Sequence, residues 1–452
     1  MLTIQQPDKL VSTILGEQSP LNSQSWRFND YVNTIPDGEN FLYFNLLTQE
    51  ILSIDKETKN EWDFGNFNAF QKDYLIKKWF LLPTDCNESS IFLQLRDTAK
   101  MVITAQNETY INNFVIFTTT YCNARCFYCF EQGRKQSSMT LKTAQDVVNF
   151  IVRSAKGNHV KIQWFGGEPL CNERVIHFIS DALKEKNISF SSKITTNAYL
   201  FKKETIQIAK EKWNLRQVVV TLDGTENEYN RIKNYTNKDP NAFCRVIQNI
   251  KDLSENNISV IIRLNINMDN VDDISVLIEQ LHGLFGQRKN IKIHPHALFE
   301  YDENGFAGTG DEILFERICS IENKLFDYGM LSISNVNSGA NMFHCMANDN
   351  HSTTILPDGR LGRCDYYCDD MTWGTLSHPS TDKSIIEFFS PLPDYEDCLS
   401  CKYLPICHKL KNCPNCSLER CRVEKKYKEN MVRHYAMEMN RRYMKKVKSI
   451  DL

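Results

Sequence analysis

The 452-residue sequence lacks the features of an exported or membrane protein. No apolar run approaches the length of a membrane span, and the segment Met1–Pro7 is neither a signal peptide nor a transit peptide. The net charge is only −3, which gives no support for a nucleic-acid-binding surface. The sequence also lacks a disordered composition, because 42% of its residues are hydrophobic and 24% are charged. We expect a globular cytoplasmic protein that binds neither membrane nor nucleic acid.

Cysteine is nearly absent from the first 110 residues, where only Cys86 occurs, and is abundant afterwards. The chain has 16 cysteines, and nine of them lie between Cys345 and Cys421. Disulfide frameworks are rare in the reducing cytoplasm. We therefore expect most of these cysteines to be metal ligands.

The first cysteine group follows the apolar run from Phe114 to Phe117. Cys122, Cys126 and Cys129 have the spacing C-x3-C-x2-C. Three thiolates can hold three irons of a cubic iron–sulfur cluster, which normally takes four protein ligands. One iron would then be open to a ligand that is not protein. A zinc site or three unrelated thiols is the alternative interpretation.

The pattern of the central region predicts an α/β fold. From about residue 113 to residue 337, strands alternate with amphipathic helices, as in parallel βα units. Six such units make a partial barrel, whose reactive groups collect at the C-terminal ends of the strands. We expect strands near 114–119, 159–164, 192–196, 216–222, 258–266 and 291–297, and helices near 140–155, 172–186, 203–212, 241–255, 271–283 and 311–327.

Glycine and polar residues follow three of these strands. Gly166, Gly167, Glu168 and Pro169 come after the second strand. Paired glycines let a backbone approach a ligand closely, and a neighbouring carboxylate can receive an ammonium group. A plain Gly-Gly turn explains that segment equally well. Thr195, Thr196 and Asn197 lie at the end of the third strand, and Thr221, Leu222, Asp223 and Gly224 at the end of the fourth.

Together these motifs resemble those of radical S-adenosylmethionine (radical SAM) enzymes. The three opening cysteines match the cluster motif of that superfamily, residues 166–169 match its GGEP motif, and residues 221–224 match a segment usually written Ser-Leu-Asp-Gly. The resemblance implies that the open iron binds the amino and carboxylate groups of S-adenosylmethionine (AdoMet). One electron would then cleave a C–S bond and give a 5′-deoxyadenosyl radical.

The resemblance also implies roles for single residues. Glu168 and the backbone of Gly166 and Gly167 would hold the AdoMet ammonium group, and Thr221 would lie near its carboxylate. Thr196 or Asn197 would lie near the ribose.

Further along the chain, the family's arginine is replaced by Lys233, with Arg231 two positions earlier. A lysine does not reproduce the bidentate fork of arginine, which leaves the partner of the AdoMet carboxylate open. The run from Ile262 to Ile266, which includes Asn265, resembles a strand that lines the adenosine, although alternation alone would also explain it as core.

The second cysteine group resembles the C-terminal SPASM extension of radical SAM peptide and protein maturases, which carries two auxiliary four-iron clusters. It begins with C-x13-G-x4-C from Cys345 to Cys364, and the family's C-x3-C step is here Cys407-x5-Cys413. A structural zinc site at Cys398 and Cys401 is the alternative. The resemblance assigns Cys345, Cys364 and Cys413, with Cys368 as a possible fourth ligand, to the first auxiliary cluster, and Cys398, Cys401, Cys407 and Cys421, with Cys416 competing for the last place, to the second.

Three other side chains are candidates for the reaction site. Asp365 follows Cys364 at a place where sulfatase-maturing relatives have a residue that resembles a catalytic base. An acidic residue hydrogen-bonded near a cluster loop is the plainer alternative. His294 and His296 alternate on the sixth predicted strand and would share one face, either reaching into the barrel mouth or lying as core or rim histidines.

The whole sequence thus predicts three domains. Residues 1–110 form a small α+β module, 111–337 a partial radical SAM barrel, and 338–452 a cysteine-rich SPASM-like domain ending in a helix. In many peptide maturases the N-terminal module resembles a winged-helix element that adds a leader peptide to a sheet edge. The alternative is that this module only covers the core and binds no peptide.

The resemblance implies AdoMet, three four-iron clusters, a ribosomally made precursor peptide and an electron donor such as flavodoxin or ferredoxin. We expect an enzyme that abstracts hydrogen from that precursor and closes a thioether, carbon–carbon or carbon–oxygen crosslink. A sulfatase-type maturase that forms formylglycine is one alternative. A non-catalytic iron–sulfur protein that binds a peptide or relays electrons is the other.

Overall fold

The computed structural model describes most of the chain. The described residues are 2–3, 25–105, 110–157, 159–298, 312–333, 336, 345–366, 371–380, 384–389, 396–413 and 418–450. Cys368 and Cys416 lie outside them, so their predicted roles stay predictions.

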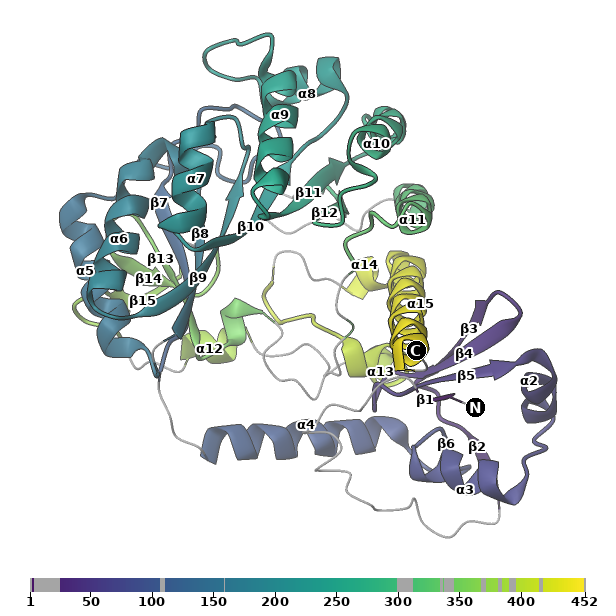
Figure 1. Ribbon diagram of the computed structural model, residues 1–452. Helices are drawn as coiled ribbons and strands as arrows, with labels where there is room; N and C mark the ends of the chain where they lie inside the picture. Colours follow the sequence, from purple (N-terminus) through teal and green to yellow (C-terminus); the bar gives the residue numbers. More distant parts are fainter. Residues whose placement is uncertain are drawn as a thin grey trace.

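A curved sheet forms the centre of the molecule, with helices along its outer side (Figure 1). Its first six strands are all parallel and follow the chain order, which confirms the predicted α/β barrel. The strands are β7 (Asn113–Thr119), β8 (His159–Gly166), β9 (Ser189–Thr196), β10 (Leu215–Thr221), β11 (Ser259–Ile266) and β12 (Ile291–Ala297). The helices are α5 (Leu141–Ser154), α6 (Glu173–Glu185), α7 (Lys203–Glu211), α8 (Glu226–Lys233), α9 (Ala242–Glu255), α10 (Val271–Phe285) and α11 (Glu312–Asp327).

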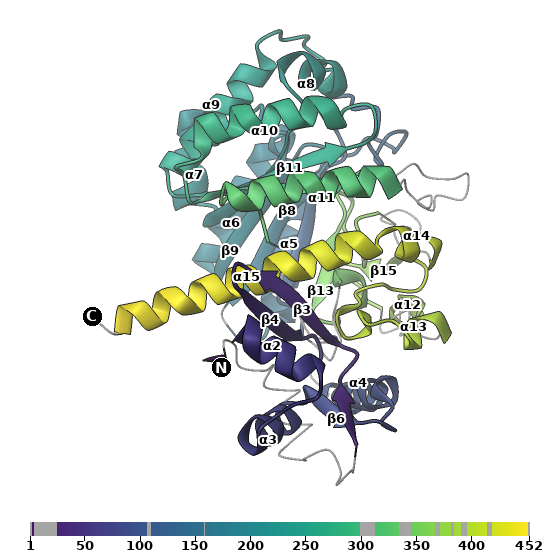
Figure 2. The same ribbon diagram turned by 90° about the vertical axis from the view of Figure 1, so that its right-hand side faces the viewer.

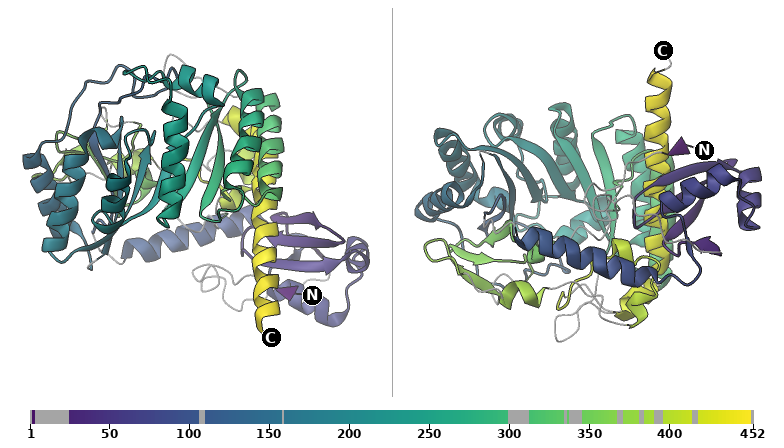
Figure 3. Two further views of the ribbon diagram at one scale, coloured as in Figure 1. Left: turned by 45° about the horizontal axis from the view of Figure 1, so that its top comes forward. Right: turned by 90° about the horizontal axis from the view of Figure 1, so that it is seen from below.

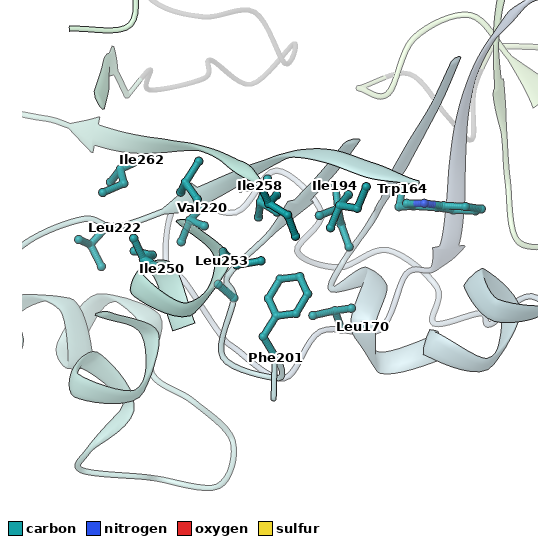
Figure 4. Packing of buried hydrophobic residues seen from close by; sticks show 14 of the residues in the cluster. Trp164, Leu170, Ile194, Phe201, Val220, Leu222, Ile250, Leu253, Ile258 and Ile262 are labelled. Atoms are coloured by element: carbon teal, nitrogen blue, oxygen red, sulfur yellow. The ribbon is translucent and has the colours of Figure 1, made fainter. Parts of the chain in front are cut away.

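The two faces of this sheet differ in chemistry. Side chains alternate along each strand, and one set is apolar and fully buried against the helices, including Trp164, Ile194, Val220 and Ile262 (Figure 4). The other set faces the inside of the barrel and is mostly polar and only partly covered. The outer face therefore holds the fold together, and the inner face is available for a ligand.

The C-terminal region continues the same sheet. Strand β13 (Ser352–Ile355) pairs in parallel with β7, and β14 (Arg360–Gly362) and β15 (Thr372–Thr375) follow as antiparallel neighbours. Leu356 packs with Val115 and Phe117 at this junction. The sheet thus has nine strands, and the cysteine-rich region begins as an extension of the barrel. Short helices follow: α12 (Ser384–Phe388), α13 (Glu396–Leu399) and α14 (Leu418–Val423).

The N-terminal module contains a small antiparallel sheet in the order β1-β5-β4-β3. In this module α3 ends at Lys77, and Leu81–Pro83 forms strand β6, which pairs with β2. The long helix α4 runs from this module toward the barrel (Figures 1 and 3). The elements are β1 (Leu2–Thr3), β2 (Trp26–Phe28), β3 (Val32–Asp37), β4 (Asn40–Asn45), β5 (Ile51–Asp55), α2 (Lys56–Asp63), α3 (Ala69–Lys77), β6 (Leu81–Pro83) and α4 (Glu88–Ala105).

The last helix, α15 (Lys425–Ile450), joins the three parts of the chain. It lies between α11 of the barrel and the N-terminal sheet (Figures 1 and 2). Tyr435 stacks on Phe44 of β4 with ring centroids 5.7 Å apart, and Val432 and Ala436 are buried beside it. One face of this helix is therefore apolar and buried against the N-terminal sheet. No helix in the described ranges is long and apolar enough to cross a lipid bilayer.

The contact between α11 and α15 contains a buried carboxyl group, Glu322, which is 6% exposed. Burial raises its pKa from 4.5 to about 7, although Asn430 of α15 donates a hydrogen bond to its Oε2 at 2.7 Å. The folded protein therefore holds a proton that the unfolded chain releases. Stability falls as pH rises from about 4.5 through 7, because the buried carboxyl must ionise.

We predict that Glu322→Gln removes the loss of stability that the wild type shows as pH rises. At pH 8 the free energy of unfolding should increase by about 3 kcal/mol, since the pKa difference is about 2.5 units and each unit corresponds to about 1.4 kcal/mol. Thermal unfolding at pH 6 and pH 8 measures it, with Glu312→Gln, an exposed carboxylate on the same helix, as control. If Glu322→Gln loses as much stability between pH 6 and pH 8 as the wild type does, the assignment is wrong.

Candidate cluster and cofactor site

The loop with the first three cysteines leaves the C-terminal end of β7. Cys122, Cys126 and Cys129 are partly buried, and burial raises the pKa of each thiol. The charges of Cys126 and Cys129 also raise the pKa of Cys122, so the three sulfur atoms are near neighbours. The structure brings together the three residues that the spacing predicts as ligands.

The glycine pair packs against this loop. Gly166 has a φ of +125°, and a Cβ there would lie 2.1 Å from the carbonyl oxygen of Thr119. A Cβ on Gly167 would lie 2.6 Å from the carbonyl oxygen of Tyr121. Both positions need glycine, because the end of β8 and the start of the cysteine loop touch through their backbones.

Glu168 joins the ends of three strands. Its buried carboxylate accepts hydrogen bonds from Thr196 Oγ1 at 2.7 Å and from the backbone N–H of Asn197 at 2.8 Å. Asn197 donates in turn to Oδ1 of Asn123 at 2.7 Å, directly beside Cys122. The predicted ligand residues of β8 and β9 thus meet on one side of the cysteine loop, and the carboxylate fixes their geometry.

A second polar network lies on the other side of the loop, around Lys233. Its ammonium group lies 2.7 Å from Asp223, and the two side chains are only 2% and 0% exposed. Lys233 also donates to Thr221 at 2.7 Å and to Tyr128 at 3.2 Å. Burial alone would lower the pKa of Lys233, but the Asp223 carboxylate raises it well above its usual value. The lysine is therefore a permanent buried cation.

Tyr128 ties this network to the cysteine loop, because it stands between Cys126 and Cys129. Its hydroxyl donates to Asp223 Oδ2 at 2.6 Å. Asn265 of β11 donates to Asp223 Oδ1 at 2.9 Å and to the Tyr128 hydroxyl at 3.2 Å. The strand ends of β10 and β11 and the end of α8 converge on one tyrosine of the loop.

Arg231 is the one predicted cofactor-binding residue that the structure does not bring to this site. Its side chain is 60% exposed and forms an ion pair with Glu228 on the surface of α8. The sequence analysis missed Asn123 and Tyr128. Their only signal is their place between the cysteines, which gives no indication of their partners across the barrel.

Comparison with known proteins identifies the domain. Residues 116–281 match the family model described as the radical SAM superfamily. The chain contains a radical SAM domain. The described part of that domain includes the cysteine loop, the glycine pair and both polar networks.

Relatives beyond the domain model are distant. The radical SAM cyclopropyl synthase TigE of Paramaledivibacter caminithermalis is 23% identical over 70% of this chain and 76% of its own length. The chain spans only 40% and 37% of two other curated relatives.

Two solved structures share the fold. One is anSMEcpe with bound AdoMet and Cp18Cys peptide, at 15% identity and a TM-score of 0.56 over 73% of this chain and 99% of that one. The other is SuiB of Streptococcus suis bound to precursor peptide SuiA, at 14% identity and a TM-score of 0.50 over 85% and 95%. Both structural matches extend beyond the radical SAM domain of this chain.

The residues of the radical SAM domain fit a four-iron cluster. In such a cluster each thiolate binds its own iron, so the sulfur atoms need not meet at one point. Among the described residues, no three metal-binding side chains converge on a single ion. The Nδ2 group of Asn123 is buried beside Cys122 and has no hydrogen-bond partner in the described protein. That donor is left for a group that is not part of the chain.

Two pairs of the described C-terminal cysteines have neighbours in common or lie near each other. Cys364 and Cys413 pack on the same small apolar cluster of Ala347, Phe389 and Leu410, and Cys345 lies two residues before Ala347. Separately, the charge of Cys421 raises the pKa of Cys407, which places these two side by side. The assignment of these cysteines to two auxiliary clusters stays a prediction.

We predict that Lys233→Met strongly destabilises the radical SAM domain, because it leaves the Asp223 carboxylate buried without its cation. Breaking a buried ion pair costs about 3–5 kcal/mol. The double variant Lys233→Met/Asp223→Asn should recover most of this loss. Chemical unfolding measures the effect, with Arg231→Gln as the exposed control. Equal stability of Lys233→Met and Arg231→Gln would contradict the prediction.

Proposed function

We propose that the chain is a radical SAM peptide maturase. It cleaves AdoMet to a 5′-deoxyadenosyl radical, abstracts hydrogen from a ribosomally made precursor peptide and installs a thioether, carbon–carbon or carbon–oxygen crosslink. The observation that carries the proposal is the packing of the N-terminal module against the cysteine-rich region. Phe44 of the module, Tyr403 beside Cys401 and Tyr435 of α15 belong to one buried cluster.

The sheet of the module offers edges to a peptide. Strand β3 lies at one edge. At the other edge, among the described residues, only Leu2–Thr3 pairs with the side of β5 that faces away from β4. An extended peptide can add a strand to such an edge through backbone hydrogen bonds. A leader segment held there would be anchored to the enzyme while its core segment reaches the barrel. The peptides in the anSMEcpe and SuiB structures support a peptide substrate.

The proposed cofactors are AdoMet and three four-iron clusters. Cys122, Cys126 and Cys129 hold the first cluster, which supplies the electron for AdoMet cleavage and receives it from a donor such as flavodoxin or ferredoxin. The other two clusters lie in the cysteine-rich region. Their ligands are Cys345, Cys364, Cys413 and the undescribed Cys368 for one, and Cys398, Cys401, Cys407 and Cys421 for the other.

Asp365 is the candidate base of the proposed reaction. Arg134, a few residues after the cysteine loop, donates to the backbone carbonyl of Asp365 at 3.4 Å and to that of Tyr366 at 2.5 Å. The ring of Tyr366 stacks on Phe130 at 5.9 Å. These contacts hold the Asp365 segment beside the first cluster loop, where a proton acceptor is useful after hydrogen abstraction.

A sulfatase-type maturase that forms formylglycine on a protein is the second candidate. The fold likeness to anSMEcpe and the position of Asp365 favour it. The N-terminal module, which accounts for a quarter of the chain, favours the peptide maturase. A non-catalytic iron–sulfur protein is the third, and the fit of the open-iron motif argues against it.

We predict that the reconstituted, dithionite-reduced protein forms 5′-deoxyadenosine from AdoMet and that Cys126→Ala abolishes this activity. The protein is then co-expressed with short peptides encoded beside its gene. Mass spectrometry detects a crosslink as a decrease in the peptide mass that corresponds to the hydrogen atoms removed. Iron binding without 5′-deoxyadenosine would favour the electron-relay alternative. Conversion of a Cys or Ser to formylglycine would favour the sulfatase-type one.

A separate prediction concerns the base. Asp365→Asn should still form 5′-deoxyadenosine, because the cluster loop is intact, but should lose most of the modified product. Liquid chromatography measures the amounts of 5′-deoxyadenosine and of modified peptide in one reaction. Asp349→Asn is the control, because Asp349 does not belong to the segment that contacts the cysteine loop. An unchanged product yield in Asp365→Asn would exclude it as the base.

A further inference from the structure

Two buried tyrosines lie where the N-terminal module meets the cysteine-rich region. Tyr31 belongs to the turn between β2 and β3, and Tyr403 follows Cys401 by two residues. The two tyrosines are 2% and 3% exposed and belong to one apolar cluster, against which Cys401 packs. Tyr31 also lines a cleft together with Ser400 and Lys402, the two chain neighbours of Cys401. One tyrosine from each region is therefore close to this cysteine.

The hydroxyl groups of Tyr31 and Tyr403 are shielded from solvent and have no hydrogen-bond partner among the described residues. Burial of a hydroxyl group without a partner is unfavourable, because the group loses its hydrogen bonds to water. Phenylalanine would fill the same space without this loss. Two such hydroxyl groups in one apolar cluster indicate an acceptor that is not part of the described chain.

Cys401 is the ionisable neighbour that the two hydroxyl groups share. Burial has the largest effect and raises the pKa of each tyrosine. Negative charge raises the pKa further, from Glu88 and Cys401 for Tyr31 and from Glu429 and Cys401 for Tyr403. The proximity that these effects indicate agrees with the packing of Cys401 on the apolar cluster.

The two carboxylates do not satisfy the hydroxyl groups. Glu88 accepts hydrogen bonds from Arg27 at 2.8 Å and from the backbone N–H of Asp30 at 3.1 Å. Glu429 is exposed to solvent on α15, whereas the hydroxyl oxygen of Tyr403 is buried. Sulfur at Cys401 is then the remaining acceptor that both hydroxyl groups have near them.

Backbone hydrogen bonds fix the segments that carry the two rings. The N–H of Tyr31 donates to Oδ1 of Asn29 at 2.9 Å, and its carbonyl accepts from the N–H of Leu46 at 3.0 Å. The carbonyl of Tyr403 accepts from the N–H of Ile406 at 3.1 Å. The fold therefore sets the positions of both tyrosines before any iron binds.

We propose that Tyr31 and Tyr403 donate hydrogen bonds to the sulfur atoms of the auxiliary cluster that Cys401 holds. The inference rests on the proposed function, because it requires that Cys401 be a cluster ligand. Reduction adds negative charge to a cluster, and hydrogen bonds to its sulfur atoms stabilise that charge. The two tyrosines are thus positioning residues that raise the reduction potential of this cluster, and one of them comes from the module that we assign to the leader peptide.

The test is the reduction potential of this cluster in Tyr31→Phe, in Tyr403→Phe and in the double variant. Redox titration followed by electron paramagnetic resonance measures the potential in the absence of AdoMet and peptide. The background chain keeps the four predicted ligands of this cluster and has Ala at the other predicted ligands that the structure describes, namely Cys122, Cys126, Cys129, Cys345, Cys364 and Cys413. The same titration in the chain with all its cysteines establishes that the background does not cause the result.

Tyr43→Phe is the matched control. Tyr43 is a buried tyrosine of the same module, 3% exposed, but it packs in another apolar cluster, edge-on against Trp62 with ring centroids 5.5 Å apart. We expect Tyr31→Phe and Tyr403→Phe each to shift the potential to a more negative value, the double variant to shift it further, and Tyr43→Phe to leave it unchanged.

A second measurement separates this role from a structural one. In the iron-free protein, Tyr31→Phe and Tyr403→Phe should unfold at the same temperature as the wild type or at a higher one, because each removes a buried hydroxyl group without a partner. A structural hydroxyl group would give the opposite pattern, with a lower unfolding temperature and an unchanged potential.

Two results would overturn the inference. One is the same potential in Tyr31→Phe, Tyr403→Phe and Tyr43→Phe. The other is a background chain that is folded by circular dichroism but binds no iron–sulfur cluster, which would show that Cys401 is not a cluster ligand. Failure of the proposed function is a distinct outcome, seen as the absence of modified peptide from the wild-type enzyme, because the potential is measured without substrate.

Discussion

The buried ion pair between Lys233 and Asp223 is the constraint on which the site depends. Two opposite charges excluded from water are tolerated only when each has further hydrogen bonds, and here Thr221, Tyr128 and Asn265 provide them. These partners come from two strand ends and from the cysteine loop. The pair therefore fixes the loop relative to the barrel, because moving the loop would leave a buried charge unsatisfied.

The loop is held from its other side by Glu168, through Asn197 and Asn123, and by the glycine pair behind it. Three thiols are thus carried on a short segment with polar anchors on both flanks, one next to Cys122 and one between Cys126 and Cys129. This arrangement limits the movement of the sulfur atoms before any iron binds. The two faces of the sheet have different roles, since the outer face is apolar and stabilises the fold, while the inner face is polar.

Much of this could be predicted from the sequence, because the signals are local. Alternation of strands and amphipathic helices located all six barrel strands within a few residues, and motif spacing located the thiols. Contacts between distant segments could not be predicted. Strand β13 pairs with β7 from more than two hundred residues away, and the hydroxyl of Tyr128 meets Asp223 across the barrel. Lys233 and Arg231 show the same limit. They are two positions apart on α8, which turns them about 200° from each other around the helix axis, so only one of them can face the site.

We propose that Cys122, Cys126 and Cys129 hold a cluster with an iron open to AdoMet. Electron paramagnetic resonance of the reduced protein, recorded before and after addition of AdoMet, tests this claim most directly. A variant with Cys345, Cys364, Cys398, Cys401, Cys407, Cys413 and Cys421 replaced by Ala isolates the signal of the first cluster. We predict a reduced-cluster signal that changes shape when AdoMet binds. A spectrum that AdoMet leaves unchanged, or the absence of any cluster signal from folded protein, would contradict the account.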